Sequence, residues 1–101
     1  MTTSQQERQC SRFEEEINKV GALLGGVRIS IHWDDGLEAA RVDLLWEAGG
    51  QGPTFEMVDA QILNAADAAG WVFDLHAGPL SACIIAGVDY PCGAYAWYRV
   101  A

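Results

Sequence analysis

Lysine and arginine are scarce in this sequence. The 101-residue chain has one lysine and five arginines, and none of them lies between Val42 and Tyr98. That stretch nevertheless carries seven carboxylates, which are Asp43, Glu47, Glu56, Asp59, Asp67, Asp74 and Asp89. With a formal net charge of −8, the chain lacks the cations that hold a nucleic-acid backbone, which excludes direct, nonspecific binding of nucleic acid. The acidity indicates either a generic solubility charge or a basic protein partner.

Cysteine and histidine are scarce as well. Cys10, Cys83 and Cys92 show no CxxC spacing, which argues against a disulfide framework and against a zinc site. Reduced thiols are the expectation, and the alternatives are a Cys83–Cys92 bridge or intermolecular pairing through Cys10. His32 and His76 fall at outward positions of predicted strands, and neither Cys83 nor Cys92 has the context of an activated nucleophile. We therefore predict no catalytic residue, no metal site and no cofactor, and we do not expect an enzyme.

The sequence also lacks long apolar runs. None approaches the roughly 20 residues that a membrane-spanning helix needs, and the first residues, MTTSQQERQCSRFEEE, are too polar for a secretory signal. A cytoplasmic location without membrane contact is the expectation. Repeats, low-complexity tracts and linkers are absent, and 50% of the residues are apolar. Residues 1–101 are therefore expected to fold as a single compact domain.

The first predicted element is an amphipathic helix. Its apolar residues recur at spacings of three and four, as on one face of an α-helix. This stripe consists of Cys10, Phe13, Ile17, Val20 and Leu24. A capping box, Ser4-Gln-Gln-Glu7, precedes the stripe, and Gly25-Gly26 is expected to end the helix.

A β-hairpin is predicted next. Residues 27–33 and 40–46 both alternate between apolar and polar, as half-buried strands do. Asp35-Gly36 is a turn signal between them. If these two residues form the whole loop, Arg28 lies opposite Asp43 and apolar residues meet on the other face, so the register is self-consistent.

The second predicted helix has an acidic outer side that contains a leucine. Residues 54–70 open with a threonine N-cap and end with a glycine. At about 100° per residue, Glu56, Asp59 and Asp67 cluster opposite the apolar side, and Leu63 falls between them. The helix dipole accounts for acids near the N-terminus, but not for Asp67 or Leu63. The buried side is expected to comprise Phe55, Val58, Ile62, Ala65, Ala66 and Ala69.

Three further strands are predicted, at residues 71–76, 80–88 and 94–100. The continuously apolar run LSACIIAGV at 80–88 suits a central strand or a short buried helix. The predicted fold class is α+β, with two helices packed on one face of a mainly antiparallel four- to five-stranded sheet. The order of elements is α-β-β-α-β-β-β.

The four tryptophans divide into two groups. Trp33, Trp46 and Trp71 are expected in the core, from their positions on the predicted strands. Trp97 shares one strand face with Tyr95 and Arg99. Such a row is typical of interface hot spots, but a sheet face covered by a helix would look similar, so both interpretations stay open.

These features favour a small acidic protein-binding inhibitor. Carboxylates at helical spacing can stand in for phosphates, so the acidic helix would occupy a basic, nucleic-acid-binding surface of a bacterial nucleic-acid-processing complex. The chain is similar, in size and charge only, to phage-encoded antagonists such as anti-CRISPR proteins, and in this role it would be a nucleic-acid mimic. The predicted partner-binding residues are Glu56, Asp59, Leu63, Asp67 and Trp97.

Two alternatives remain at this stage. One is an immunity protein that neutralises a nuclease toxin, which has the same size and charge. The other is a structural subunit or homodimer with no inhibitory role. Its assembly surfaces would be the long first helix and the C-terminal strand, which can pair with another copy if it lies at a sheet edge. The sequence does not decide the oligomeric state.

Overall fold

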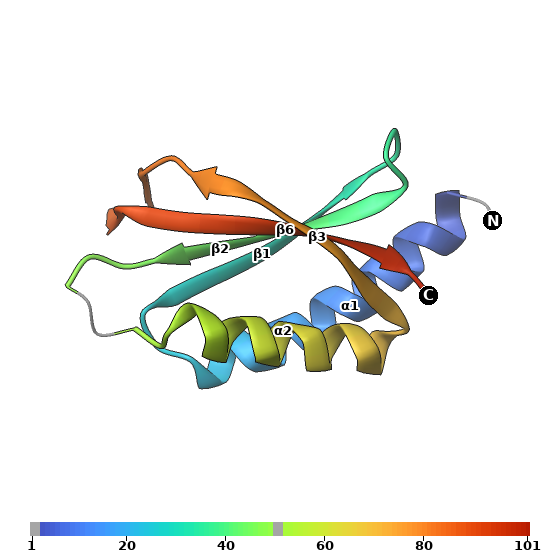
Figure 1. Cartoon of the computed structure of the whole chain (residues 1–101), viewed down its shortest axis with the longest axis horizontal. Coiled ribbons are helices and arrows are strands. Elements are labelled where there is room, and N and C mark those ends of the chain that lie inside the picture. Colours follow the sequence, from blue (N-terminus) through green and yellow to red (C-terminus); the bar gives the residue numbers. More distant parts are fainter. Residues whose placement is uncertain (1–2, 50–51) are drawn as a thin grey trace.

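Two helices lie on one side of a four-stranded antiparallel sheet (Figure 1), as the sequence predicts. The structure, a computed structural model, describes residues 3–49 and 52–101, with side chains from residue 10 onward. The predicted capping box at residues 4–7 lies outside the described side chains. The helices are α1 (Thr3–Leu23) and α2 (Phe55–Ala69). The strands are β1 (Val27–Asp34), β2 (Ala39–Trp46), β3 (Trp71–Leu80), β4 (Cys83–Ile85), β5 (Val88–Tyr90) and β6 (Cys92–Val100).

The C-terminal strand lies inside the sheet. The strand order is β1-β2-β6-β3, so β6 pairs with β2 on one side and with β3 on the other. The alternative in which the terminal strand pairs with another copy at a sheet edge is therefore wrong. The edges are β1 and β3, because the last strand of the chain inserts between two earlier ones.

The β1–β2 hairpin forms, but its predicted register is wrong by two residues. Ser30 pairs with Asp43, and Arg28 faces Leu45 rather than Asp43. The loop has four residues, because Asp34 Oδ1 accepts a hydrogen bond from the Leu37 amide at 2.9 Å and Glu38 takes a left-handed φ of 50°. A shift of two residues keeps each side chain on its predicted face.

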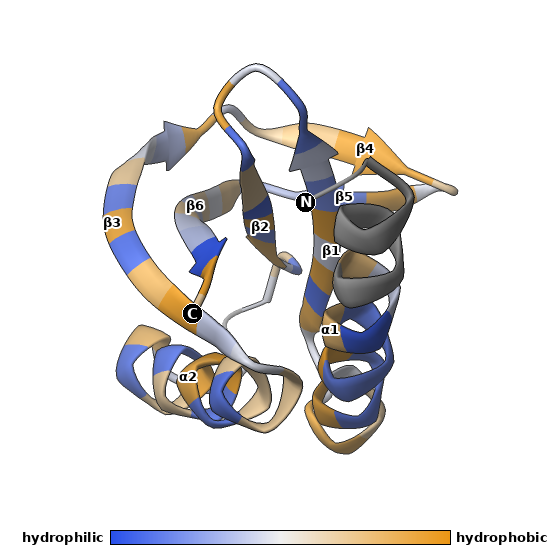
Figure 2. Ribbon diagram, turned by 90° about the vertical axis from the view of Figure 1, so that its right-hand side faces the viewer, coloured by the Kyte–Doolittle hydropathy of each residue, from blue (hydrophilic) through white to orange (hydrophobic). Residues whose placement is uncertain are grey.

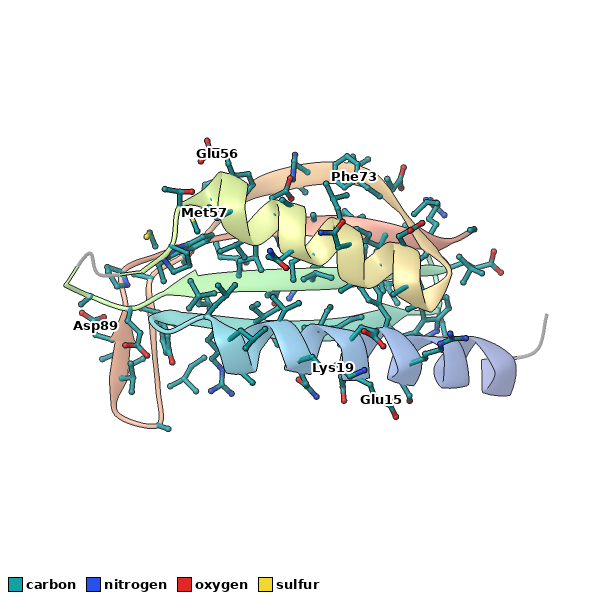
Figure 3. All side chains as sticks on the ribbon, turned by 90° about the horizontal axis from the view of Figure 1, so that it is seen from below. Glu15, Lys19, Glu56, Met57, Phe73 and Asp89 are labelled. Carbon is teal, nitrogen blue, oxygen red and sulfur yellow. The ribbon has the colours of Figure 1, made fainter. Side chains whose placement is uncertain are left out.

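The apolar run at 80–88 is neither a central strand nor a helix. It forms most of a separate β4–β5 hairpin, which runs across the strand direction and extends past β1 (Figure 3, where Asp89 marks β5). Ala86 and Gly87 both have positive φ, 52° and 80°, which closes a tight two-residue turn. Ile84 is 72% exposed as a result. An Ala-Gly turn inside an apolar run gives no polar signal, so periodicity does not reveal it.

The core lies between the helices and the sheet. Phe13 of α1 packs on Trp71 and Tyr98, with ring centroids 5.4 and 5.3 Å apart. The apolar stripe of α1 contributes to this core as predicted, through Phe13 and Ile17 with Cys10, Val20 and Leu24 packed around them. The predicted core tryptophans also face it, with Trp71 buried and Trp33 and Trp46 half-buried.

Helix α2 begins and ends where the sequence predicts. Thr54 Oγ1 accepts a hydrogen bond from the Met57 amide at 3.3 Å, and Gly70 ends the helix with a φ of 80°. Five of the six residues predicted for its inner side are buried, and the sixth, Phe55, lies at the exposed end beside Trp46. No helix in the described part of the chain is long and apolar enough to cross a membrane.

Candidate interaction surfaces

The outer side of α2 carries two carboxylates without partners. Glu56 and Asp67 are exposed, and within the described residues neither side chain forms a hydrogen bond or an ion pair. Leu63 lies between them along the helix and is 40% exposed. Glu56, Leu63 and Asp67 are called the α2 face below. Both ends of the helix are capped, so these side chains stand on a rigid backbone.

Asp59 does not belong to this face. Its Oδ1 lies 3.1 Å from His76 Nε2, and the side chain is only 21% exposed. The pairing of β3 with β6 shifts register between Phe73 and Leu75, which leaves Asp74 as the extra residue of a β-bulge. The bulge interrupts the alternation of faces and turns His76 toward α2. The predicted outward position of His76 is therefore wrong, and Asp59 pairs internally.

Leu63 lies toward the edge strand β3. Residues four positions apart in a helix lie above one another, so Leu63 shares the side of α2 on which Asp59 contacts β3. The exposed Phe73 is on that strand, beside α2 (Figure 3), and its ring packs on His76 with centroids 4.7 Å apart. Leu63 is therefore the member of the α2 face that lies toward β3, on the side of the exposed Phe73.

Trp97 lies on the opposite face of the sheet. Its neighbours Ala96 and Tyr98 lie in the core, so by the alternation of a strand Trp97 and Tyr95 point to the other face. No described helix covers that face (Figure 2). Their rings form an edge contact with centroids 6.5 Å apart, and the Arg41 guanidinium lies 5.3 Å from the Tyr95 ring. The interpretation of this row as helix-covered is excluded. Trp97 and the α2 face therefore cannot meet one flat partner surface together.

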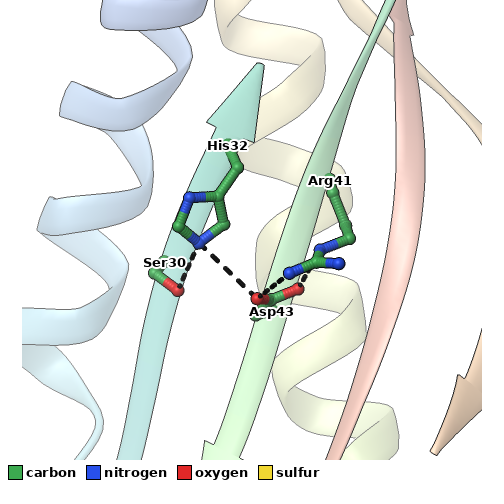
Figure 4. Close-up of polar contacts among 4 residues, drawn as sticks. All are labelled: Ser30, His32, Arg41 and Asp43. Atoms are coloured by element: carbon green, nitrogen blue, oxygen red, sulfur yellow. Dashed lines mark hydrogen bonds and ion pairs between the residues drawn. The ribbon is translucent and has the colours of Figure 1, made fainter. Parts of the chain in front are cut away.

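A polar cluster occupies the same open face (Figure 4). Arg41 Nε lies 2.8 Å from Asp43 Oδ1, and His32 Nε2 lies 3.5 Å from Asp43 Oδ2. Ser30 Oγ also approaches His32 Nε2, at 3.5 Å. A catalytic serine–histidine–aspartate relay needs the acid and the hydroxyl on different ring nitrogens. Here both approach the same nitrogen, so the cluster places Arg41 and His32 around the buried Asp43 and does not activate Ser30.

A cleft separates this open face from the β4–β5 hairpin. Its volume is about 530 Å³. The lining residues are Arg28, Ser30, His32, Asp43, Leu45, Leu80, Ser81, Cys83 and Ile85. The sequence alone does not predict this cleft, because the position of the cleft depends on where the β4–β5 hairpin folds back. The predicted alternation of residues 27–33 places Arg28, Ser30 and His32 on one face of the strand, and this is the only feature of the sequence that relates to the cleft.

The charges are divided unevenly between internal pairs and solvent. Within the described residues, Arg12 donates to the Ala68 carbonyl, and Lys19, Arg41 and Arg99 pair with Glu16, Asp43 and Asp74. Arg28 is the one lysine or arginine with a described side chain that has no partner. By contrast, seven described carboxylates have none, and they are Glu14, Glu15, Glu38, Glu47, Glu56, Asp67 and Asp89. The surface acidity is therefore largely uncompensated.

All three cysteines lie within the described side chains. Cys10, Cys83 and Cys92 are free, so the alternative Cys83–Cys92 bridge does not form. Burial, and then the nearby Glu14 carboxylate, raises the pKa of the Cys10 thiol above its usual value. A raised pKa lowers the thiolate fraction and with it the nucleophilicity. No group of three histidine, cysteine or acidic side chains that could hold a metal occurs among the described residues.

Comparisons with protein-family models, with curated proteins and with solved structures give no match for this chain.

Proposed function

We propose that the chain is a protein-binding inhibitor and that the α2 face is its principal contact. The observation that carries the proposal is the pair of unpartnered carboxylates, Glu56 and Asp67, on a helix capped at both ends. They are separated by roughly 16 Å along the axis at 1.5 Å per residue. Two anions fixed on a rigid helix lose little conformational entropy when they bind a basic groove. Leu63 supplies the apolar contact that purely charged interfaces lack.

The proposed partner is the basic, nucleic-acid-binding surface of a bacterial nucleic-acid-processing complex. The uncompensated acidity supports this partner, since opposite charge steers association. The chain would then act as an antagonist of the phage anti-CRISPR kind, with its carboxylates in place of phosphates. An immunity protein against a nuclease toxin has the same electrostatic requirement and differs only in the identity of the target.

The structure changes the set of residues assigned to this contact. Asp59 is omitted because it pairs with His76. Trp97 is assigned to a second contact on the open face, since it lies on the other side of the sheet. A partner that reaches both must pass around the β3 edge, where Phe73 and Leu75 are exposed.

The test is capture from bacterial lysate followed by competition with a defined ligand. Proteins retained by the chain are identified by mass spectrometry, purified, and titrated with a fluorescent duplex DNA in the presence of the chain. We expect the retained protein to bind the DNA and the chain to displace it, with an effect that weakens as salt rises. A retained protein that binds no nucleic acid, or whose DNA the chain leaves in place, contradicts the proposal.

Matched double variants locate the contact. Glu56→Gln with Asp67→Asn removes both carboxylates of the α2 face, and Glu14→Gln with Glu15→Gln removes two equally unpartnered carboxylates of α1. The two variants have the same net charge. We expect only the first to lose displacement of the DNA. Equal losses would assign the effect to net charge and remove the α2 face from the proposal.

Self-association is a second candidate, favoured by the exposed edge strand β3. Val72 and Leu75 on this strand are 49% and 48% exposed, and an apolar edge can pair with another copy. The bulge at Asp74 and the proline at position 79 shorten the regular edge. Sedimentation velocity at low and high salt separates the candidates, because apolar self-association survives salt.

A further inference from the structure

We propose that the cleft between the open sheet face and the β4–β5 hairpin binds a small organic carboxylate with an apolar body. This site lies on the face opposite α2 and is independent of the proposed inhibitory contact. Its volume of about 530 Å³ falls within the range of small-molecule sites, about 300–1,000 Å³.

The polar side of the cleft is a row on β1. Arg28, Ser30 and His32 alternate along the strand, so their side chains share one face at intervals of about 6.6 Å. Ser30 and His32 offer further hydrogen-bonding atoms beside the guanidinium. Arg28 is left without an acidic partner on β2 because the hairpin register places it opposite Leu45.

The electrostatics of the cleft select an anion. Arg28 has no partner within the described residues, and its planar guanidinium matches a carboxylate through two parallel hydrogen bonds. Asp43 is the one carboxylate among the residues that line the cleft, and Arg41 and His32 already face it. An organic cation therefore finds no free acid there, whereas an organic anion finds a free guanidinium.

The opposite side of the cleft is apolar apart from Ser81. Leu80, Cys83 and Ile85 form it, and Leu45 is buried beneath them although it lies on the open face of the sheet. Because side chains alternate along β4, Cys83 and Ile85 face the cleft while Ile84 points away to solvent. An apolar body between Leu80 and Ile85, with its carboxylate at Arg28, satisfies both sides of the cleft.

The test uses three eight-carbon probes that differ only in the head group. Octanoate, octanol and octylamine are titrated separately into the full chain while backbone amide signals are followed by NMR. We expect octanoate to bind most tightly and to shift the signals of residues 28–32 and 80–85. Octanol binding as tightly as octanoate, shifts confined to other regions, or an absence of octanoate binding would each overturn the proposal.

Two charge-matched variants assign the carboxylate contact. Arg28→Gln should weaken octanoate binding about tenfold, since a charge-assisted hydrogen bond is lost, and should leave octanol binding unchanged. Lys19→Gln removes one positive charge from α1 and should bind octanoate as the parent does. Equal effects of both variants overturn the proposal. Well-dispersed amide signals verify that each variant is folded.

Two further arms distinguish this site from the α2 face and from a peptide-binding groove. The Glu56→Gln, Asp67→Asn variant should bind octanoate like the parent, so loss of the inhibitory contact and loss of this site are distinguishable. An N-acetylated tetrapeptide with a C-terminal leucine presents the same carboxylate on a peptide. If it binds more tightly than octanoate, the cleft recognises a chain end and the small-molecule proposal is overturned.

Discussion

His76 on the edge strand β3 and Asp59 on α2 form a contact of 3.1 Å between Nε2 and Oδ1. This contact joins the middle of the sheet edge to the second turn of the helix, and the Phe73 and Phe55 rings pack on the same imidazole. It removes one carboxylate from the acidic side of α2. The pair therefore holds the α2 face in place without belonging to it.

Replacing Asp59 tests this distinction. Asp59→Asn should lower the free energy of unfolding by no more than about 1 kcal/mol, because the pair is partly exposed. Asp67→Asn should change it by less than about 0.5 kcal/mol, since Asp67 has no partner. Urea unfolding followed by circular dichroism measures both. A larger loss for Asp67→Asn than for Asp59→Asn would contradict the assignment of roles.

Tyr98 is expected to make the free energy of unfolding depend on pH in the alkaline range. Burial, and then the nearby Asp59 carboxylate, raises the pKa of this hydroxyl above its ordinary value of 10.0. The folded chain thus holds the proton more tightly than the unfolded chain, so the contribution is complete below pH 10 and falls as the pH rises above it. Unfolding measured between pH 8 and 11 should show this loss.

Two phenylalanine variants assign that loss to Tyr98. Tyr98→Phe should reduce the decline in stability above pH 10, whereas Tyr95→Phe, on the open face, should not. At neutral pH, Tyr98→Phe should be neutral or slightly stabilising, because the buried hydroxyl has no hydrogen-bond partner in the described chain. An unchanged alkaline decline in Tyr98→Phe contradicts the prediction.

Trp97 and Trp71 should differ in their effect on stability. Trp71→Ala removes a buried ring that contacts Phe13 and Trp33, and should cost about 3–5 kcal/mol. Trp97→Ala removes a half-buried ring on the open face and should cost roughly 1–2 kcal/mol. Thermal or urea unfolding compares them. Equal costs would mean that Trp97 acts as a core residue.

Gly93 lies where no side chain fits. A Cβ at this position would lie 2.8 Å from the Leu44 carbonyl oxygen and 2.7 Å from Leu45 Cδ2. Backbone cannot move aside cheaply, so Gly93→Ala should destabilise the fold by about 1–3 kcal/mol. Gly78→Ala is the control, because nothing lies within 4 Å of its added Cβ. Similar unfolding midpoints for the two variants would contradict the close packing of β6 on β2.

The sequence alone determines the local secondary structure of this protein. The apolar stripe of α1, the capped span of α2, the inward faces of β1 and β2 and the α+β class all follow from short-range periodicity and capping, which involve neighbours within a few residues. The exposed positions of Glu56, Leu63 and Asp67 follow for the same reason. A period of 3.6 residues and two helix caps are sufficient to place them.

The tertiary structure decided everything that depends on which segments pair. The register of the β1–β2 hairpin leaves Arg28 without an acid, and the bulge at Asp74 turns His76 toward Asp59. The insertion of β6 between β2 and β3 places Trp97 on the open face. Strand pairing joins residues far apart in the chain, and several registers satisfy the same alternation. Only the packed sheet selects one of them, and with it the partners of each charged side chain.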